Sequence, residues 1–249
     1  MEPNIPIYLS VLFTGLTAAL SGLIIYGVSR AIKKMYPSNP TMQRITGFVA
    51  LCLVMWLIFL KVISTKHILD QWSLMPPRLM IILLPPLIVT ILIASSKKTG
   101  ELLKNIPTHW MIYVQSFRIL MEVILLLLFV EKIIPVQMTF EGRNFDILVG
   151  ITALITGTGV MKNKISPKGI IAWNMFGLIL LANIVIVAVL STPLPIRTFM
   201  NEPANTVIAY FPFVWLAGFV VPVAYSLHVF SIKKALAEIK QKQISHSVI

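Results

Sequence analysis

The chain has 249 residues, of which 57% are hydrophobic and only 12% are charged, and its mean hydropathy is +0.87. A soluble domain carries roughly 25% charged residues, so this composition excludes a soluble globular protein and predicts a polytopic membrane protein. The net charge of +12 would favour nucleic acid in a soluble chain. In a membrane protein, basic loop residues report orientation instead, so we expect no nucleic-acid partner.

Seven apolar segments follow one another along the chain, each near the length of about 20 residues that a helix needs to cross a bilayer. Lipid leaves open backbone hydrogen-bonding groups unsatisfied, which excludes an open sheet. We therefore predict one all-α domain, a bundle of seven transmembrane helices with a basic tail at 231–249. The predicted helices span residues 7–29, 45–63, 78–95, 110–130, 145–161, 170–190 and 207–230.

The basic residues predict the orientation of this bundle. With the N-terminus outside and the C-terminus cytoplasmic, fourteen of the 21 Lys and Arg residues fall in the four inner segments, as the positive-inside rule requires. They are Arg30, Lys33, Lys34, Arg44, Lys97, Lys98, Lys104, Lys162, Lys164, Lys168, Lys233, Lys234, Lys240 and Lys242.

Small residues on two segments predict helix packing faces, because they let membrane helices approach closely. In segment 145–161 these are Gly150, Ala153 and Gly157. In segment 7–29 a hydroxyl stripe at helical spacing runs beside four small residues, and packing is favoured over a polar pathway. That face consists of Ser10, Thr14, Gly15, Thr17, Ala18, Ala19, Ser21 and Gly22.

Prolines predict kinks in two segments. Segment 78–95 contains Pro85 and Pro86, and segment 207–230 contains Pro212 and Pro222. In the N-outside orientation both helices run inward. Segments 1–3 and 5–7 are then either parallel repeats, as in several transporters, or simply contain two independently kinked helices.

A polar face interrupts the apolar segment 110–130. Gln115, Arg118 and Glu122 stand three and four residues apart, which places them on one side of a helix. Charged groups inside a membrane are costly, so this side must face the bundle interior, where Arg118 and Glu122 are predicted to neutralise each other. The pair is either structural or part of a substrate or proton site, and the sequence leaves both interpretations open.

A second polar cluster lies in the predicted outer loop PVQMTFEGRNFD. It contains Glu141, Arg143, Asn144 and Asp146 just before segment 145–161. Asn144 or Asp146 is expected to cap the following helix through its free N–H groups. The alternative is a site for a cation or a polar headgroup, although the spacing matches neither a calcium loop nor a catalytic carboxylate pair.

The chain lacks sequence signatures of cofactors. His67, His109, His228 and His246 show no metal-binding spacing, so we interpret them as interfacial residues and predict no metal site. Segment 207–230 contains no lysine for a Schiff base, which excludes retinal. No cofactor is predicted, and the lipid bilayer is the expected partner.

The run QSFRILMEVILLLL, followed by PVQMTFEGRNFDILVGITA, resembles an uncharacterised family of bacterial seven-helix integral membrane proteins. The resemblance covers about 40 residues directly and the whole chain by topology. It implies a location in the bacterial cytoplasmic (inner) membrane and no assigned activity.

Three functional hypotheses follow. The leading one is a transporter of a small polar solute or an ion-coupled permease, which uses the polar face of segment 110–130 and the kinked helices. The alternatives are a non-catalytic assembly or sensory protein and an enzyme acting on a lipid headgroup at the outer face. A cavity that reaches Arg118 favours transport, a packed interior favours the assembly protein, and an open acidic outer groove favours the enzyme.

Overall fold

The computed structural model describes residues 3–36 and 39–247, and within these ranges every regular element is a helix. Three short elements, two of them 3-10 turns and one a π-helix, separate the longer α-helices. The elements in order are α1 (Ile7–Met35), α2 (Asn39–Thr65), α3 (Met80–Ser95), α4 (Lys97–Lys104), α5 (Thr108–Val114), α6 (Phe117–Val130), η1 (Val136–Met138), α7 (Ile147–Met161), α8 (Pro167–Leu190), η2 (Val207–Ala209), the π-helical η3 (Leu216–Val220) and α9 (Val221–Ser247).

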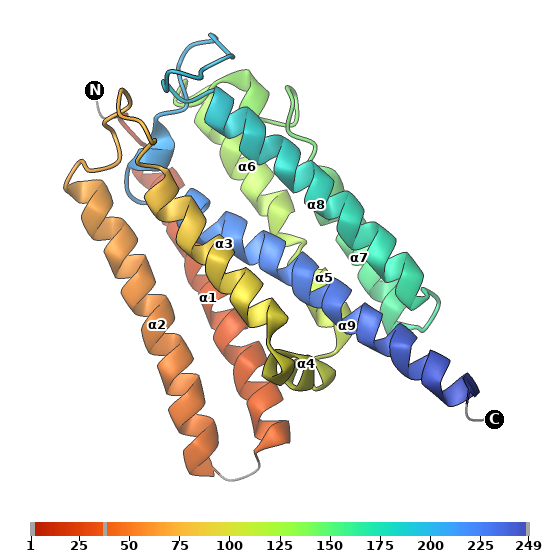
Figure 1. Ribbon diagram of the computed structural model, residues 1–249. Helices are drawn as coiled ribbons and strands as arrows, with labels where there is room; N and C mark the ends of the chain where they lie inside the picture. The colour runs from red at the N-terminus through yellow and green to blue at the C-terminus, as the bar shows by residue number, and fades with distance from the viewer. Residues whose placement is uncertain (1–2, 37–38, 248–249) are drawn as a thin grey trace.

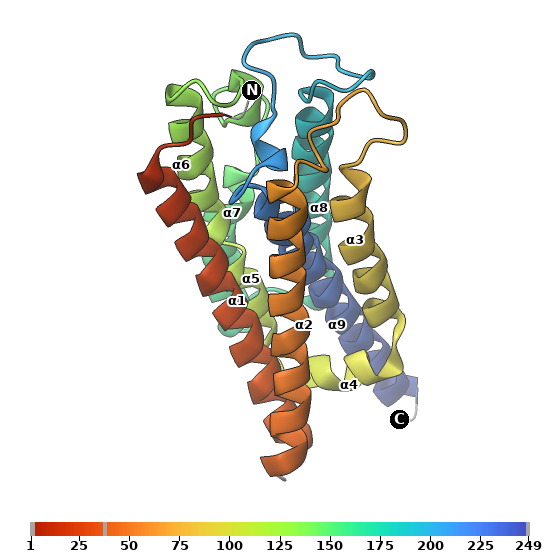
Figure 2. The same cartoon turned by 90° about the vertical axis from the view of Figure 1, so that its left-hand side faces the viewer.

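The long helices run up and down in one bundle, and the two termini of the chain lie at opposite ends of this bundle (Figures 1 and 2). Five spans in the described residues are long and apolar enough to cross a membrane, and α3 with α4, bent by 78°, makes a sixth if counted as one. The apolar helix α7 is shorter. The prediction of an all-α membrane protein is confirmed at this level. The five spans are Ile7–Met35, Pro40–Thr65, Thr108–Val130, Pro167–Leu190 and Leu216–Ser245.

The packing face predicted on segment 7–29 is wrong for its small residues. Gly15 and Gly22 are exposed, and a Cβ added at either would meet nothing within 4 Å. Thr17 and Ser21 instead donate to carbonyls of their own helix, which satisfies hydroxyls without a partner helix. The buried side of α1 carries large residues such as Phe13, whose ring stacks on Phe213. Large apolar side chains, rather than small ones, fill the space behind α1.

The packing face predicted on segment 145–161 is confirmed. A Cβ added at Gly150 would lie 2.8 Å from Cγ1 of Ile119, and one added at Gly157 would lie 2.8 Å from the Tyr113 ring. Ala153 between them is fully buried. The missing side chains therefore let α7 lie directly against α5 and α6, as small residues do in membrane bundles.

The two proline-containing segments each contain an irregularity. Pro85 and Pro86 lie inside α3, and the sharp bend comes ten residues after Pro86, at Ser96 between α3 and α4. In the last segment, residues 207–213 form a 3-10 turn and further turns rather than a helix. Pro222 has no N–H to donate to the carbonyl of Gly218, and Trp56 of α2 donates to that oxygen instead (Nε1 to O, 2.8 Å).

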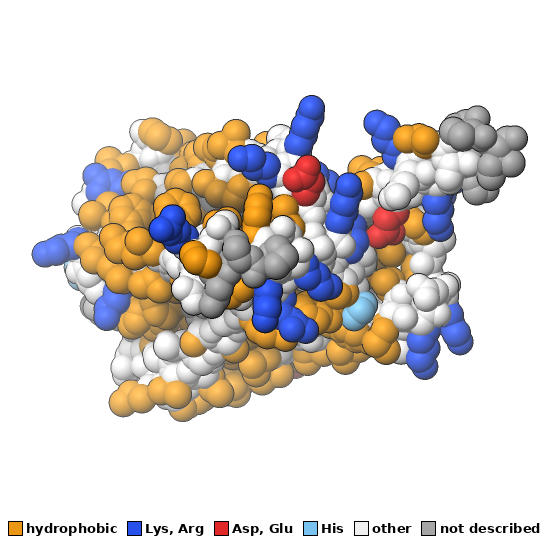
Figure 3. All heavy atoms as spheres, turned by 90° about the horizontal axis from the view of Figure 1, so that it is seen from below, with side chains coloured by type: hydrophobic (Ala, Val, Ile, Leu, Met, Phe, Trp, Pro, Cys, Tyr) orange, Lys and Arg blue, Asp and Glu red, His pale blue; other side chains and the backbone are white. Residues whose placement is uncertain are grey.

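The predicted basic tail continues α9. Residues 231–247 are helical, and the last two residues of the predicted tail lie outside the described residues. Two of its lysines bind ends of other helices, since Lys233 donates to the carbonyls of Ala94 and Ser96 and Lys234 donates to that of Ile106. Basic side chains stand out around this lower end of the bundle in Figure 3.

Candidate functional site

The centre of the bundle holds a polar site built on a broken helix. The predicted helix 110–130 is interrupted between α5 and α6, where the N–H groups of Gln115 and Ser116 bond carbonyls three residues back, both at 3.0 Å. Tighter turns of this kind often mark functional positions in membrane helices. Gln115, Arg118 and Glu122 are 1%, 1% and 2% exposed, so all three predicted residues face the interior.

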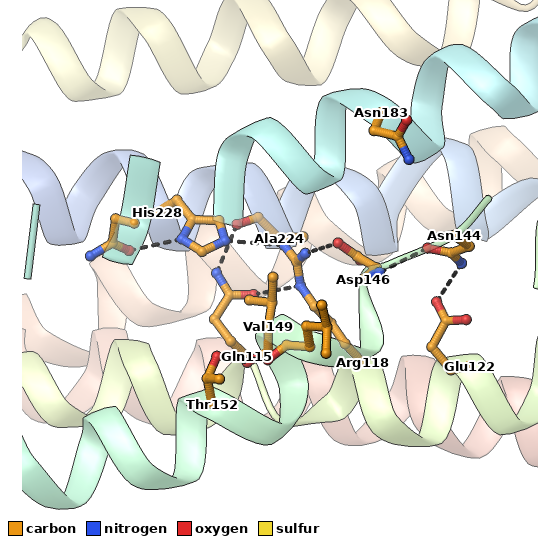
Figure 4. Close-up of polar contacts among 12 residues, drawn as sticks. Gln115, Arg118, Glu122, Asn144, Asp146, Val149, Thr152, Asn183, Ala224 and His228 are labelled. Atoms are coloured by element: carbon orange, nitrogen blue, oxygen red, sulfur yellow. Dashed lines mark hydrogen bonds and ion pairs between the residues drawn. The ribbon is translucent and has the colours of Figure 1, made fainter. Parts of the chain in front are cut away.

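Arg118 is the hub of this site (Figure 4). Its Nε donates to Oε1 of Gln115 at 3.1 Å, its Nη1 forms an ion pair with Oδ1 of Asp146, and its Nη2 donates to Nε2 of His228 at 3.2 Å. Gln115 in turn donates to the carbonyl of Ala224 on α9 at 3.0 Å. A charge-assisted network therefore joins the break in α5–α6 to α7 and α9.

The predicted pairing of Arg118 with Glu122 is wrong. Spacing along one helix permits that pair, but Asp146, the residue just before α7, supplies the carboxylate that binds Arg118. Glu122 is held by Asn144, whose Nδ2 donates to Glu122 Oε1 and to the carbonyl of Met138. A loop distant in sequence thus provides both partners, which helical spacing alone does not reveal.

The predicted outer cluster separates into two parts. Asn144 and Asp146 are buried and belong to the Arg118 network, whereas Glu141 and Arg143 are exposed. Arg143 lies over the ring of Phe199, 5.0 Å from its centroid. The loop folds tightly because Gly142 approaches the backbone of η1, where an added Cβ would stand 2.3 Å from a carbonyl oxygen.

The predicted capping of α7 by a side chain is also wrong. Asp146 occupies the N-cap position, but its carboxylate binds Arg118 rather than an N–H group of α7. Asn144 accepts a hydrogen bond from the backbone N–H of Asp146 at 3.0 Å, which fixes the loop rather than the helix end. The two residues expected to cap the helix are therefore used to bind the side chains of α6.

His228 and Asn174 belong to the site, although sequence reasoning placed His228 at the interface and overlooked Asn174. Asn174 Nδ2 donates to Ser231 Oγ at 2.9 Å, so its Oδ1 is the acceptor that faces His228 Nδ1 at 2.8 Å. His228 is therefore a neutral Nδ1–H tautomer whose Nε2 accepts from Arg118. Asn174 is one of two asparagines in the apolar segment 170–190, the other being Asn183, and a polar side chain in such a segment was the available sequence signal.

Glu122 borders a cavity of about 80 Å³ that also contacts Arg118, Asn144 and Asp146. Glu122 Oε2 is buried without a hydrogen-bond partner among the described residues. Buried carboxylate oxygens are ordinarily bonded, so an unpaired one beside a cavity is the feature of this site that requires a chemical reason.

The fold and site define a multi-pass helical membrane protein with a connected polar network inside its bundle. Comparison of the chain with protein-family models, with curated proteins and with solved structures finds no match. No three His, Cys, Asp or Glu side chains in the described ranges come together to hold a metal ion. The groups that the site offers are its two carboxylates, Arg118, the imidazole of His228 and several side-chain amides.

Proposed function

We propose that this protein is a proton-coupled transporter of a small solute, and that Glu122 is its proton-binding group. The supporting observation is that Glu122 Oε2 is buried, unpaired and in contact with the cavity. We place the protein in a bacterial inner membrane, in keeping with its resemblance to the bacterial seven-helix family.

The charge balance around Glu122 supports a proton site. The charged groups that face it are Arg118 and Asp146, which offset each other as an ion pair, and His228 beyond them is neutral. An ionised Glu122 would leave one uncompensated negative charge in the bundle. Isolated charges are expensive in this environment, so Glu122 must bind either a proton or a cationic group. Exchange between these two states is the elementary step of ion-coupled transport.

The cavity favours transport over the two alternatives. It contacts both Arg118 and Glu122, whereas an assembly protein was expected to have a packed interior. An enzyme at the outer face needs the carboxylates of Glu141 and Asp146 to act together. Asp146 is instead buried against Arg118, while Glu141 is exposed.

Two irregular backbone segments border the site, and the helices can move relative to one another at these segments. The α5–α6 break carries Gln115, and the π-helix η3 supplies Leu216, Ala217 and Val220 to the cavity wall. Discontinuous helices at a central binding site are typical of secondary transporters. Motion at these breaks would open the cavity without unfolding a regular helix.

The proposed topology has seven crossings with the N-terminus outside, and α7 is the additional crossing. Its 15 residues extend roughly 22 Å, at 1.5 Å per residue, which is short for a bilayer core and requires local thinning. An odd number of crossings is supported by chain ends at opposite ends of the bundle.

In a Cys52→Ser background, Lys164→Cys should react with an impermeant maleimide only from the cytoplasm and Asn201→Cys only from outside. Labelling of Lys164→Cys from outside would show that the proposed orientation is inverted.

The proposed function is tested by electrical recording from proteoliposomes adsorbed on a solid-supported membrane. A step in pH should give a transient current in the wild type, because protons that reach Glu122 move through part of the membrane field. The current should disappear in Glu122→Gln and persist in Glu141→Gln, which alters an exposed carboxylate. Equal currents in the wild type and Glu122→Gln would refute Glu122 as the coupling group.

A further inference from the structure

The walls of the cavity have a composition that restricts what it can bind. Almost all of its lining side chains are apolar, and most of them come from α6, α8, η3 and the start of α9, with others from α3, η1 and η2. Its volume of about 80 Å³ is several times the roughly 10–15 Å³ that one water requires. Apolar walls of this extent favour a ligand with a hydrocarbon body over a fully hydrated ion.

The polar end of the cavity contains one buried side-chain atom that has no hydrogen-bond partner in the described part of the chain, and that atom is an acceptor. The nitrogens Nε, Nη1 and Nη2 of Arg118 each have a partner, and Asn144 uses both its amide nitrogen and its oxygen within the site. Glu122 Oε2 remains. A ligand that completes the network must therefore donate a hydrogen bond to this oxygen.

The charge balance of the site further restricts the chemical class of ligand that it can bind. The Arg118–Asp146 pair is balanced, so Glu122 is the one charged group of the network without an opposite charge of its own. A protonated amine supplies both the missing donor and the missing positive charge, and charge-assisted hydrogen bonds are stronger than neutral ones. A neutral alcohol supplies only the donor, and a carboxylate supplies neither.

The position of the cavity indicates the route of access. Leu83 of α3 and Val185 and Val189 of α8 line the cavity and are only half-buried, so the side chains that separate the cavity from the outer surface of the bundle include these three. Both helices pack against α9. That outer surface is apolar on α3 and α8, as expected where helices face lipid. A ligand with a hydrocarbon body can thus arrive from the membrane.

We infer that the cavity binds lipophilic primary amines, with the ammonium group on Glu122 and the hydrocarbon body between α3 and α8. This ligand class rests on the proposed function, because it makes the amine the solute exchanged against the proton. When the ammonium binds, the carboxyl O–H bond of Glu122 breaks, the proton leaves to solvent, and the carboxylate keeps the electron pair and accepts a hydrogen bond from an N–H group of the ammonium. One cation replaces one proton, so the site's charge is unchanged.

The test is calorimetric titration of the purified full-length protein in nanodiscs with hexylamine, hexanol and hexanoate. Hexylamine should bind saturably, with an affinity at least about tenfold above that of hexanol, the gain expected for a charge-assisted hydrogen bond. Hexanoate should not bind. In weakly buffered solution, hexylamine should release protons in the wild type, and its affinity should fall as the pH is lowered. Equal affinities for hexylamine and hexanol would overturn the inference.

Three variants locate the bound amine. Glu122→Gln replaces the free acceptor with an amide that can donate, and should weaken hexylamine binding about tenfold or more. Ala188→Phe fills the cavity wall and should weaken both hexylamine and hexanol, while Ile186→Phe, at an exposed position outside the cavity lining, should change neither. Unchanged hexylamine binding in Ala188→Phe would place the amine elsewhere and refute the site.

The two proposals fail in different ways. A wild-type pH-step current that depends on Glu122, without selective binding of hexylamine, would remove the ligand class and leave proton coupling in place. Selective hexylamine binding that depends on Glu122, without that current, would keep the binding site and remove the transporter. Circular dichroism of each variant should match the wild type, and Glu122→Asp, which retains the carboxylate, should recover part of the hexylamine affinity lost in Glu122→Gln.

Discussion

Replacing Gly177 with alanine should destabilise the protein by displacing His228. A Cβ at Gly177 would lie 2.3 Å from Cε1 and 2.5 Å from Nε2 of His228, whereas carbon atoms prefer separations of about 3.5–4.0 Å. The ring must therefore move by about 1 Å or more. It cannot do so freely, because Arg118 and Asn174 hold it at both nitrogens.

The expected cost follows from these two hydrogen bonds. Each buried group left without its partner costs about 1–3 kcal/mol, and alanine in a helix recovers up to about 1 kcal/mol relative to glycine. We therefore expect the free energy of unfolding to fall by about 3 kcal/mol. Gly22→Ala is the matched control, because an added Cβ meets nothing within 4 Å there, and it should be neutral or slightly stabilising.

The assay is reversible unfolding in mixed micelles as the fraction of denaturing detergent is increased. Gly177→Ala should be measured alone and in a His228→Ala background, which removes the ring that the new methyl group contacts. In that background the cost should largely disappear, giving a coupling energy of about 2 kcal/mol or more between the two positions. The same cost in both backgrounds would show that Gly177→Ala acts through something other than His228.

Two further predictions use the same unfolding assay. Asp146→Asn should cost about 3–5 kcal/mol because it leaves Arg118 as an uncompensated buried cation, whereas Glu122→Gln should cost far less, and the reverse order would contradict the observed ion pair. Trp56→Phe and Trp215→Phe each remove one interhelical hydrogen bond and should cost about 1 kcal/mol, so a stability unchanged in both would show that these bonds contribute nothing.

Sequence periodicity was sufficient for the helical architecture and for the inward direction of Gln115, Arg118 and Glu122. Intramembrane charge is so costly that a polar stripe in an apolar segment has only one direction to face. The same reasoning identified the close packing at Gly150 and Gly157. These inferences succeeded because each depends on one helix and on the solvent around it.

The partners within the site could not be read from the sequence in the same way. The Arg118–Asp146 and Glu122–Asn144 contacts join residues 28 and 22 positions apart through a folded loop. Helical spacing ranks only local pairs, so it chose Arg118–Glu122. The prediction of close packing at the small residues of α1 failed for a related reason. Small residues permit close packing, but they do not show whether a neighbouring helix occupies the space.

The uninterrupted course of α9 gives the protein a mechanical linkage. His228 binds the central network, and five residues later Lys233 holds the elbow between α3 and α4, about 7.5 Å further along the same stiff rod. A rotation of α9 about its axis would displace the partners of Arg118 and of the α3–α4 elbow at the same time. The hydrogen bonds of the central network and the position of α4 at the lower end of the bundle are thus coupled through a single helix.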